Sequence, residues 1–426
     1  MNNTNKPKII NIMPHGPAYS YSPDEKPDVW WEKSNGNLLG FWTREWPNLL
    51  GAAVLKQTDQ YEWEVWQPDY RADKIYSRRL KTGVVYKLFP AQEKMYRSGL
   101  KTWKDIHSGE IISRLSSLRK ECIYLQLHGF PSALNIELLS LLGPKKRYPI
   151  FLVTHCLFLS PLKELFGLHR PLTYLDLLVR QKRYYRSLQY VDVVGGQNQA
   201  SLNNIQMVYS GRVEKLHMGC DFDFWIPIPS DEIKKNVRKK LSISDNRTVF
   251  LATGNFVSLK QFDKLIKAFQ KLSDREEFLL IIAGHGNKQS TDYLSSLAGK
   301  LILQNKVIIH PYITGEPLRN LYWASDVYIS VATNEGGPVS VMKAMACGLP
   351  LLSTPTGDTG DMMKKHGVGR FVPIKHYDEW TNAISEILGK ELPKPLDIEI
   401  ARAAYDWPNI AERFINIYDD LRNIYY

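Results

Sequence analysis

The sequence of 426 residues has little cysteine and no long apolar run, and both absences exclude classes of protein. Its four cysteines, Cys122, Cys156, Cys220 and Cys347, show neither a CxxC pair nor the Cys/His spacing of a metal site. We therefore expect buried free thiols in a reducing compartment. No segment reaches the roughly 18 apolar residues of a membrane span. The N-terminus lacks the apolar core of a signal peptide, so a cytoplasmic location is predicted.

Acidic residues are also scarce, since 44 Asp and Glu stand against 55 Lys and Arg, and the formal net charge is +11. Nucleic acid, anionic lipid and phosphorylated small molecules all suit such a charge. Zinc-finger spacing, an RNP-type aromatic motif and a basic zipper are all missing, so we predict no nucleic-acid partner. The basic and aromatic stretch 180–186 has the composition of a membrane-surface helix. Peripheral association with an anionic membrane surface is one hypothesis, and a solvated helix face is the other.

What the chain does contain is a repeated alternation of apolar strands with helices, which is typical of doubly wound α/β domains. A length of 426 residues is too great for one ordinary core. A Pro-x-Pro stretch at 227–229, followed by a charged helix, indicates a connection between two domains. We predict an N-terminal domain over 1–226, a C-terminal domain over 227–407 and a final helix over 408–426.

The stretch from Thr333 to Asp361 carries the clearest functional signal. Pro338 stands where a first helical position is expected, and Gly348 where a C-terminal cap is expected. A Gly-Gly turn that leads from a parallel strand into a helix leaves backbone N–H groups directed at one point, which suits an anion. Glu335 precedes that turn, and we interpret it as an acceptor for a neutral polar group such as a hydroxyl.

Two histidines, His128 and His155, end successive apolar strands. Ligands bind at such strand ends in open parallel sheets, so a functional and a structural role are both open. The N-terminal third is rich in tryptophan, which indicates either core packing or a sugar-stacking wall at a cleft. The tryptophans concerned are Trp30, Trp31, Trp42, Trp46, Trp63 and Trp66.

Several motifs follow one another in a fixed order. They are Gly254-Asn-Phe-Val-Ser-Leu-Lys-Gln261, the strand and Gly-x-Gly of Leu279–Gly286, Leu318–Asp326, Glu335–Gly348 and, upstream, Leu216–Pro227. Together they resemble the motifs of family 4 of the retaining glycosyltransferases. The resemblance covers residues 145–426 well and the N-terminal third loosely. It implies the GT-B fold, in which two Rossmann-like domains face a central cleft and the C-terminal helix packs back on the N-terminal domain. The N-terminal domain would bind the acceptor, and the C-terminal domain the donor.

The resemblance also implies residue roles. Lys260 would neutralise the donor diphosphate, while Glu335 and His155, the predicted catalytic residues, would contact the transferred sugar. The predicted donor-binding residues are Lys260, Asn255, Gly336, Gly337, Pro338, Val339, Lys343, Tyr312 and Gly16. No metal or other cofactor is expected, because lysine and helix-end dipoles can offset the charge of the departing diphosphate.

Two residues depart from the family pattern. Lys343 stands eight positions after Glu335, where the family has a second glutamate that clasps the ribose hydroxyls. An ammonium only donates hydrogen bonds, so it cannot reproduce that grip; it would meet a phosphate instead or lie in solvent. Asn255 replaces the usual arginine and removes a charge from the phosphate site.

These features leave two main hypotheses. The first is a retaining glycosyltransferase that moves a sugar from a nucleotide-diphosphate donor to a glycan, lipid-linked or other hydroxyl acceptor in cell-surface polysaccharide or glycoconjugate synthesis. The second is a catalytically silent GT-B protein that binds a sugar nucleotide or a partner. A GT-B sugar-nucleotide epimerase is a third, but its acid/base carboxylates are not identifiable here.

Overall fold

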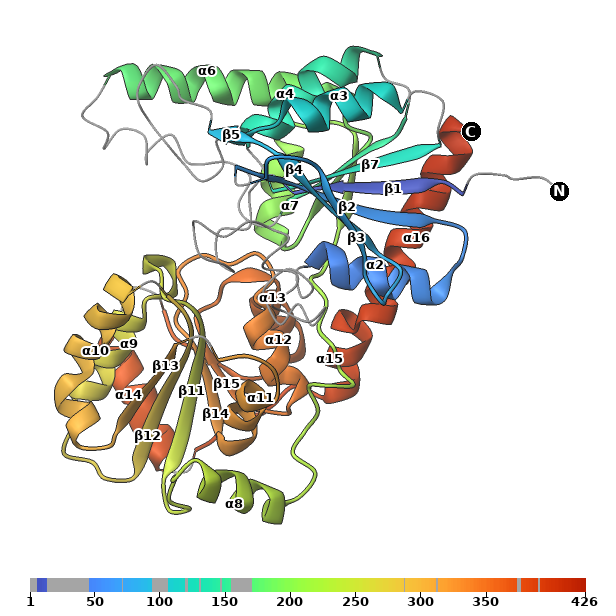
Figure 1. Cartoon of the computed structure of the whole chain (residues 1–426). Coiled ribbons are helices and arrows are strands. Elements are labelled where there is room, and N and C mark those ends of the chain that lie inside the picture. Colours follow the sequence, from blue (N-terminus) through green and yellow to red (C-terminus); the bar gives the residue numbers. More distant parts are fainter. Residues whose placement is uncertain are drawn as a thin grey trace. The chain divides into compact units, whose positions relative to one another are not determined.

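The chain forms two compact α/β units, each with its own sheet (Figure 1). The first unit comprises Met1–Gly219 and Trp407–Tyr426, and the second comprises Cys220–Asp406. This computed structural model describes residues 6–13, 46–70, 72–93, 106–118, 122–129, 132–145, 148–154, 171–286, 288–311, 313–373, 377–389 and 391–426.

The sheet of the first unit has the strand order β10-β9-β8-β7-β1-β2-β4-β3 within the described ranges. All neighbouring strands are parallel except β3 and β4. The bounds are β1 Lys8–Ile12, β2 Glu62–Asp69, β3 Tyr76–Arg79, β4 Val85–Pro90, β7 Ile123–His128, β8 Ile150–Val153, β9 Val193–Gly196 and β10 Arg212–Lys215. A small antiparallel ribbon joins β5 (Gln92–Glu93) to β6 (Ile106–His107). The central strands β1 and β7 are almost wholly buried because both faces of the sheet are covered.

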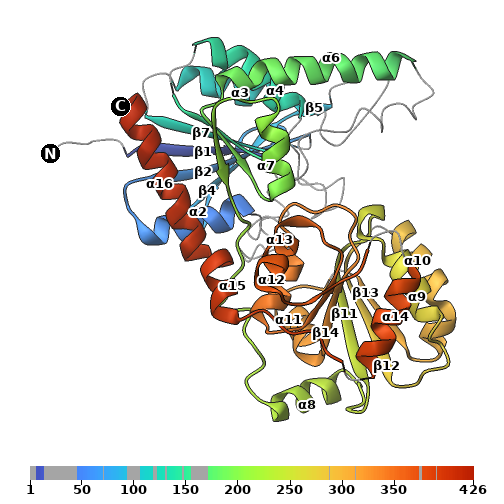
Figure 2. The ribbon, with the colours of Figure 1, turned by 180° about the vertical axis from the view of Figure 1, so that it is seen from behind.

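Helices cover the two faces of the first sheet (Figure 2). Alternate residues of β1 separate the two cores, since Ile9 belongs to one and Ile10 to the other. Beside Ile9 lie α2 (Trp46–Gln57) and α16 (Trp407–Tyr425). The opposite face carries α3 (Gly109–Ser117), α4 (Ala133–Leu142), α6 (Pro171–Ser187) and α7 (Gln199–Gln206). Three short 3-10 helices also occur in the described residues, at Gly143–Lys145, Leu188–Tyr190 and Ser258–Lys260.

The final helix α16 belongs to the first unit, although the second unit precedes it in the chain. Its apolar side chains, such as Phe414 and Tyr418, are buried against α2 and the sheet. Gln57 Nε2 donates a hydrogen bond of 2.6 Å to the carbonyl of Pro408, and Tyr61 is hydrogen-bonded to Asp419. The chain therefore returns to its first unit through a packed helix.

The described tryptophans of the N-terminal third are core residues. Trp46, Trp63 and Trp66 are 7%, 1% and 1% exposed. Trp63 Nε1 donates to the carbonyl of Pro47, and Trp66 Nε1 donates to Glu64. Packing is therefore the correct interpretation for these three side chains. Trp30, Trp31 and Trp42 lie outside the described residues.

The second unit is built on a parallel sheet with the order β13-β12-β11-β14-β15-β16 in the described part of the chain. The strands are β11 Thr248–Asn255, β12 Phe278–His285, β13 Val307–Pro311, β14 Val327–Ser330, β15 Leu351–Ser353 and β16 Arg370–Phe371. The chain first builds outward from β11 to β13 and then returns to place β14 on the other side of β11. This reversal is a topological switch point, beyond which ligands bind in open α/β sheets.

Helices also cover both faces of the second sheet (Figure 1). The buried residues of α9 (Phe262–Gln270), α10 (Lys288–Leu303) and α14 (Tyr377–Leu388) share one core. The other helices are α8 (Asp231–Lys240), α11 (Gly315–Ala324), α12 (Val339–Ala346), α13 (Gly357–His366) and α15 (Ile398–Tyr405). Among the residues that can be described, no helix combines the length and apolar character needed to cross a bilayer.

The units divide at Gly219/Cys220, ahead of the prolines at which the sequence placed the boundary. The aromatic residues before those prolines pack on α11, which assigns them to the second unit. Trp323 Nε1 donates to the carbonyl of Ile226 at 2.8 Å, and the Trp225 ring lies 5.3 Å from that of Tyr322. The amide of Cys220 also donates to the carbonyl of Tyr405, which places the incoming and outgoing segments side by side.

Candidate functional site

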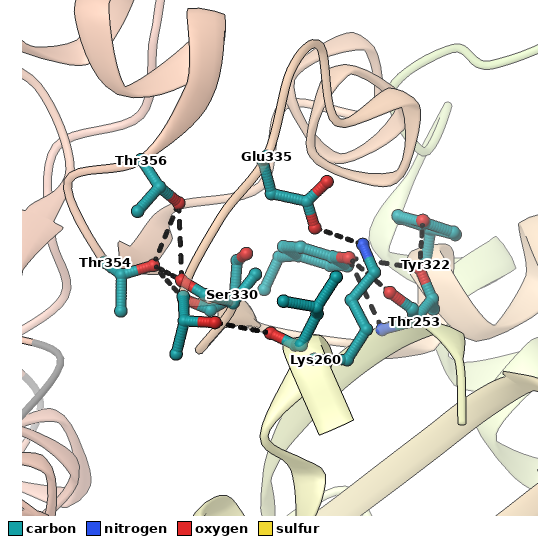
Figure 3. Close-up of polar contacts among 11 residues, drawn as sticks. Thr253, Lys260, Tyr322, Ser330, Glu335, Thr354 and Thr356 are labelled. Atoms are coloured by element: carbon teal, nitrogen blue, oxygen red, sulfur yellow. Dashed lines mark hydrogen bonds and ion pairs between the residues drawn. The ribbon is translucent and has the colours of Figure 1, made fainter. Parts of the chain in front are cut away.

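Lys260 and Glu335 form an ion pair at the switch point of the second sheet (Figure 3). Lys260 ends the 3-10 turn that follows β11, and Glu335 lies in the loop that follows β14. Because β11 and β14 are neighbouring parallel strands, two side chains that are 75 residues apart in sequence meet beyond the carboxyl ends of these strands. The two side chains are only 20% and 15% exposed, so water screens the pair incompletely. The structure thus unites the residues predicted to hold diphosphate and sugar.

The end of β11 is shaped so that the Lys260 side chain can lie across it. Gly254 has φ +153°, and a Cβ there would come within 3.0 Å of Lys260 Cε. After the turn, Gln261 adopts a left-handed conformation with φ +50°, and α9 starts at the next residue. The amide of Thr333 donates to the carbonyl of Leu259, which ties this turn to the loop that carries Glu335.

The loop from Glu335 to Pro338 is packed between the starts of α12 and α13. The amide of Asp358 donates to the carbonyl of Gly336 at 2.8 Å. Gly357 has φ +72°, and a Cβ there would lie 3.0 Å from Glu335 Cβ. Any larger residue at this point would press on the Glu335 side chain and on the carbonyl of Gly336. Gly357 is therefore needed for the position of Glu335.

Helix α12 begins one residue later than the sequence predicted. Pro338 is the N-cap, with φ −73° and ψ 94°, and Val339 is the first helical residue. Proline has no side-chain acceptor, so the N-cap residue itself does not cap the N–H groups of this first turn. The helix ends at Ala346, and Gly348 follows with φ +72°, the left-handed conformation expected after a helix C-terminus.

Two threonines that follow β15 are hydrogen-bonded to the loop that carries Glu335, and the sequence analysis did not identify them. Thr354 Oγ1 donates to the carbonyl of Ala332 at 2.6 Å, and its amide donates to the carbonyl of Ser330. Thr356 Oγ1 lies 3.4 Å from the same Ala332 carbonyl (Figure 3). Both threonines hold the β14 loop against β15. Their position just after a parallel strand was the signal that could have found them.

A buried hydroxyl cluster links β11 to α12. Thr253 Oγ1 lies 2.9 Å from the Tyr322 hydroxyl and 3.1 Å from the Tyr328 hydroxyl. The rings of these two tyrosines are stacked on each other. Tyr322 also donates to the carbonyl of Ser340 at 3.0 Å. Burial raises the pKa of Tyr322, so this hydroxyl keeps its proton and remains a donor. The first turn of α12 is therefore fixed relative to the sheet.

Lys343 adopts an arrangement that the sequence did not anticipate. Its ammonium lies 4.6 Å from the ring centroid of Trp225, close enough for a cation–π interaction. Buried thiols surround this position: burial raises the pKa of Cys347 to about 12, while the charges of Arg319 and Lys343 act in the opposite direction. Burial likewise raises the pKa of Cys220. Lys343 thus connects α12 to Trp225, which lies in the segment at the start of the second unit.

The remaining predicted residues are distributed as follows. Asn255 is the last residue of β11 and is exposed, and its carbonyl accepts from the amide of Val257. Gly336 and Gly337 belong to the loop between Glu335 and Pro338, and Val339 is the first residue of α12. His155, Tyr312 and Gly16 lie outside the described residues. Asn255 and this loop therefore lie at the carboxyl end of the sheet, where Lys260 and Glu335 meet.

His128, by contrast, has a structural role. Its side chain is fully buried, with Nε2 at 2.9 Å from Gln126 Nε2 and 3.0 Å from Asn11 Oδ1. The ring packs edge-on against Trp46 at 5.0 Å. A histidine so enclosed satisfies core polar groups and cannot meet a ligand without rearrangement. Its carbonyl, moreover, accepts a hydrogen bond from Asn135 Nδ2.

Three of the four cysteines lie within the described residues. Cys220 and Cys347 are buried and Cys122 is half-buried, and all three are free, as the sequence predicted. Cys156 lies outside the described part of the chain. Within that part, no group of three or more His, Cys, Asp and Glu residues is arranged to hold a metal ion.

Comparison with solved structures identifies the architecture. The chain is similar to sucrose-phosphate synthase from Thermosynechococcus elongatus, with a TM-score of 0.70, 15% identity and coverage of 98% of this chain and 100% of that one. It is also similar to HepE from Anabaena, solved in complex with UDP-glucose, with a TM-score of 0.62, 18% identity and coverage of 97% and 99%. The fold is GT-B. The predicted fold class is thereby confirmed.

One family model matches within the second unit of this GT-B chain, up to the first residue of α16. Residues 233–407 match the family model described as glycosyl transferases group 1, and this range includes Lys260 and Glu335. An uncharacterized glycosyltransferase of Methanocaldococcus jannaschii is 27% identical over 191 residues, which are 44% of this chain and 48% of the relative. A D-inositol 3-phosphate glycosyltransferase of Xylanimonas cellulosilytica is 22% identical over 235 residues, or 53% and 56%. The chain thus spans about half the length of the curated relatives that it matches.

Proposed function

We propose that this chain is a glycosyltransferase that takes its sugar from a nucleotide-diphosphate donor held by the second unit. The observation that carries the proposal is the meeting of Lys260 and Glu335 at the switch point, beside the uncapped start of α12. An ammonium and helix N–H groups suit a diphosphate. A carboxylate suits the hydroxyls of a sugar. The resemblance to HepE, whose structure contains UDP-glucose, supports a nucleotide sugar as the ligand class.

The chemistry follows from the charges at this edge. As the diphosphate departs, negative charge grows on its oxygens, and Lys260 with the N-terminal dipole of α12 would stabilise it. Glu335 would hold the sugar by accepting from its hydroxyls. We assign no protein nucleophile, and we propose front-face departure and attack with retention of configuration. Gly336, Gly337, Pro338 and Val339 would position the donor together with Asn255, Lys343 and Tyr312. His155 is proposed as a second catalytic residue and Gly16 as a donor-binding residue, and both lie outside the described residues.

The proposed acceptor is a hydroxyl of a glycan or of a lipid-linked molecule, bound by the first unit, in cell-surface polysaccharide or glycoconjugate synthesis. We further propose that the protein acts in the cytoplasm, peripherally at the inner face of the membrane, and without a metal ion. The excess of basic residues supports an anionic surface as partner, since the formal net charge is +11.

A panel of donors tests the proposal. The full chain is incubated with UDP-, GDP-, ADP- and dTDP-sugars, and both the melting temperature and the release of nucleoside diphosphate are measured, with and without EDTA. We expect one donor class to raise the melting temperature and to be turned over equally in EDTA. Lys260→Ala should abolish both effects, whereas Lys267→Ala, an exposed lysine on α9, should change neither.

Three other outcomes have distinct meanings. If no donor shifts the melting temperature or is turned over, the proposal fails. If a donor stabilises the protein but is neither hydrolysed nor transferred to any offered acceptor, the silent binding protein is supported instead. Proton NMR of the product's anomeric proton tests retention separately, because an inverted product contradicts front-face attack.

A further inference from the structure

A pocket of about 590 Å³ opens on the first unit, between α4 and α6. One wall comes from α4 and includes Ile136 and Leu141, and the other comes from α6 and the turn that follows it. The pocket belongs to the first unit, whereas Lys260 and Glu335 belong to the second. It is therefore a separate feature from the proposed donor site.

The α6 wall presents unpaired positive charge. Arg183 and Arg186 line the pocket, are three residues apart on one helix face, and are both exposed. Neither guanidinium has an ion-pair or hydrogen-bond partner among the residues that the structure describes. The pocket's carboxylate, Glu137, is instead paired with His107 at 2.6 Å. Two guanidiniums that share one wall form a strong site for a phosphate, which each can bind through two parallel hydrogen bonds.

Apolar side chains are exposed next to these cations. Leu141 in the pocket wall is 48% exposed, and Val179 on α6 is 47% exposed. Val179, Arg183 and Arg186 are spaced by four and three residues, so they lie along one stripe of the helix. A helix face that combines cations with exposed apolar residues suits the boundary between lipid headgroups and acyl chains.

We propose that the pocket between α4 and α6 binds the phosphate headgroup of an anionic membrane lipid. Arg183 and Arg186 take the phosphate, while Leu141 and Val179 contact the apolar region below it. A soluble sugar phosphate would satisfy the arginines but leave the apolar residues in water. This site gives the proposed peripheral membrane association a location and a ligand class, and it rests on that part of the proposed function.

Vesicle sedimentation tests the site. The full chain is sedimented with phosphatidylcholine vesicles that contain or lack phosphatidylglycerol, over a range of salt concentrations. We expect binding only to the anionic vesicles and weaker binding at high salt. Arg183→Ala combined with Arg186→Ala should lower the vesicle affinity by about tenfold or more, since each basic residue near a membrane surface contributes about 1 kcal/mol. Leu141→Ser should also lower it at high salt, where screening leaves the apolar contact dominant.

The matched control removes the same charge elsewhere. Lys235 and Lys239 on α8 are exposed and four residues apart, and neither forms an ion pair with a described residue. Lys235→Ala combined with Lys239→Ala should keep most of the vesicle binding. Equal losses of vesicle binding in the two double variants would mean that the membrane attracts the net charge alone, and this would overturn the proposal of a lipid site in the pocket. Equal binding to neutral vesicles, or none to anionic ones, would overturn it as well.

Two further measurements separate the ligand sources and the two proposals. Inorganic phosphate at millimolar concentration should not release the protein from vesicles beyond the effect of an equal ionic strength of chloride. Specific release by phosphate would indicate a site for a soluble anion and contradict the lipid proposal. The arginine double variant should retain donor stabilisation, and Lys260→Ala should retain vesicle binding. Each proposal can therefore fail while the other stands.

Discussion

Lys260 and Glu335 are bonded to each other across the switch point of the second sheet, in the place where we propose that the donor's diphosphate and sugar lie. The pair is mostly shielded from water, at 20% and 15% exposure, so each charge depends on the other. On the proposed function, we expect an anionic donor to separate them, because its phosphate would compete with the carboxylate for the ammonium. Donor binding would then exchange one partner of Lys260 for another.

This competition predicts opposite effects of Glu335→Gln on binding and on turnover. Loss of the carboxylate charge frees Lys260, so nucleoside diphosphate should bind several-fold more tightly by calorimetry. Turnover of the sugar donor should fall by roughly tenfold to a hundredfold, since hydrogen bonds to charged groups contribute roughly 1.5–3 kcal/mol. Glu232→Gln, at an exposed position on α8, is the control and should change neither quantity. Weaker nucleoside diphosphate binding by Glu335→Gln would contradict the exchange.

A second prediction concerns Lys343 and Trp225. Their contact should contribute about 0.5–2 kcal/mol to the stability of the second unit. Urea denaturation of Lys343→Met, Trp225→Leu and the double variant measures this coupling as a double-mutant cycle. Strictly additive effects would show that the two side chains do not stabilise each other. Because Lys343 is also a proposed donor residue, we expect its substitution to raise the donor KM several-fold; an unchanged KM limits Lys343 to packing.

A third prediction concerns Asp326, the residue just before β14. Its carboxylate accepts from Arg238 Nη2 at 2.6 Å, Lys234 Nζ at 2.7 Å and the amide of Val249 at 2.8 Å. The Arg238 side chain is only 6% exposed, so its charge depends on this partner. Asp326→Ala should lower the free energy of unfolding by roughly 3–5 kcal/mol. Asp378→Ala breaks only an exposed pair with Lys271 and should leave the urea midpoint unchanged. A similar, small effect of both variants would show that the three hydrogen bonds to Asp326 do not stabilise the second unit.

The fourth prediction is a loss of stability at high pH. Burial raises the pKa of Tyr148 and of Tyr209 to about 12, against about 10 in an unfolded chain. The folded state therefore retains protons that the unfolded state loses. The corresponding stability is fully present below pH 10 and disappears as the pH rises from about 10 towards 12.

Absorbance of tyrosinate and chemical unfolding at stepped pH values measure this effect together. We expect part of the tyrosine signal to appear only as the chain unfolds. Tyr209→Phe should lose less stability between pH 9 and pH 11 than the parent chain, although it forfeits the hydrogen bond to the Val191 carbonyl. Complete titration near pH 10 without unfolding would contradict the raised pKa values.

Several parts of the site were predictable because they are written in short stretches of sequence. Lys260 follows a strand and a short turn, and Glu335 precedes a glycine pair and a helix, so each could be assigned to a strand end from its own neighbours. Gly348 could be assigned to a helix end for the same reason. The predicted start of α12 at Pro338 was wrong by one residue, since proline suits both the N-cap and the first helical position.

The sequence by itself determined the alternation of strands and helices, the two α/β units and the residue types at the strand ends, because these depend on local periodicity and turn chemistry. Only the tertiary structure decided which strand ends adjoin. The strand order that places β14 beside β11 is what pairs Glu335 with Lys260. The packing of the entering segment on α11 and α12 is what brings Trp225 to Lys343. Such contacts join distant stretches, and no local pattern encodes them.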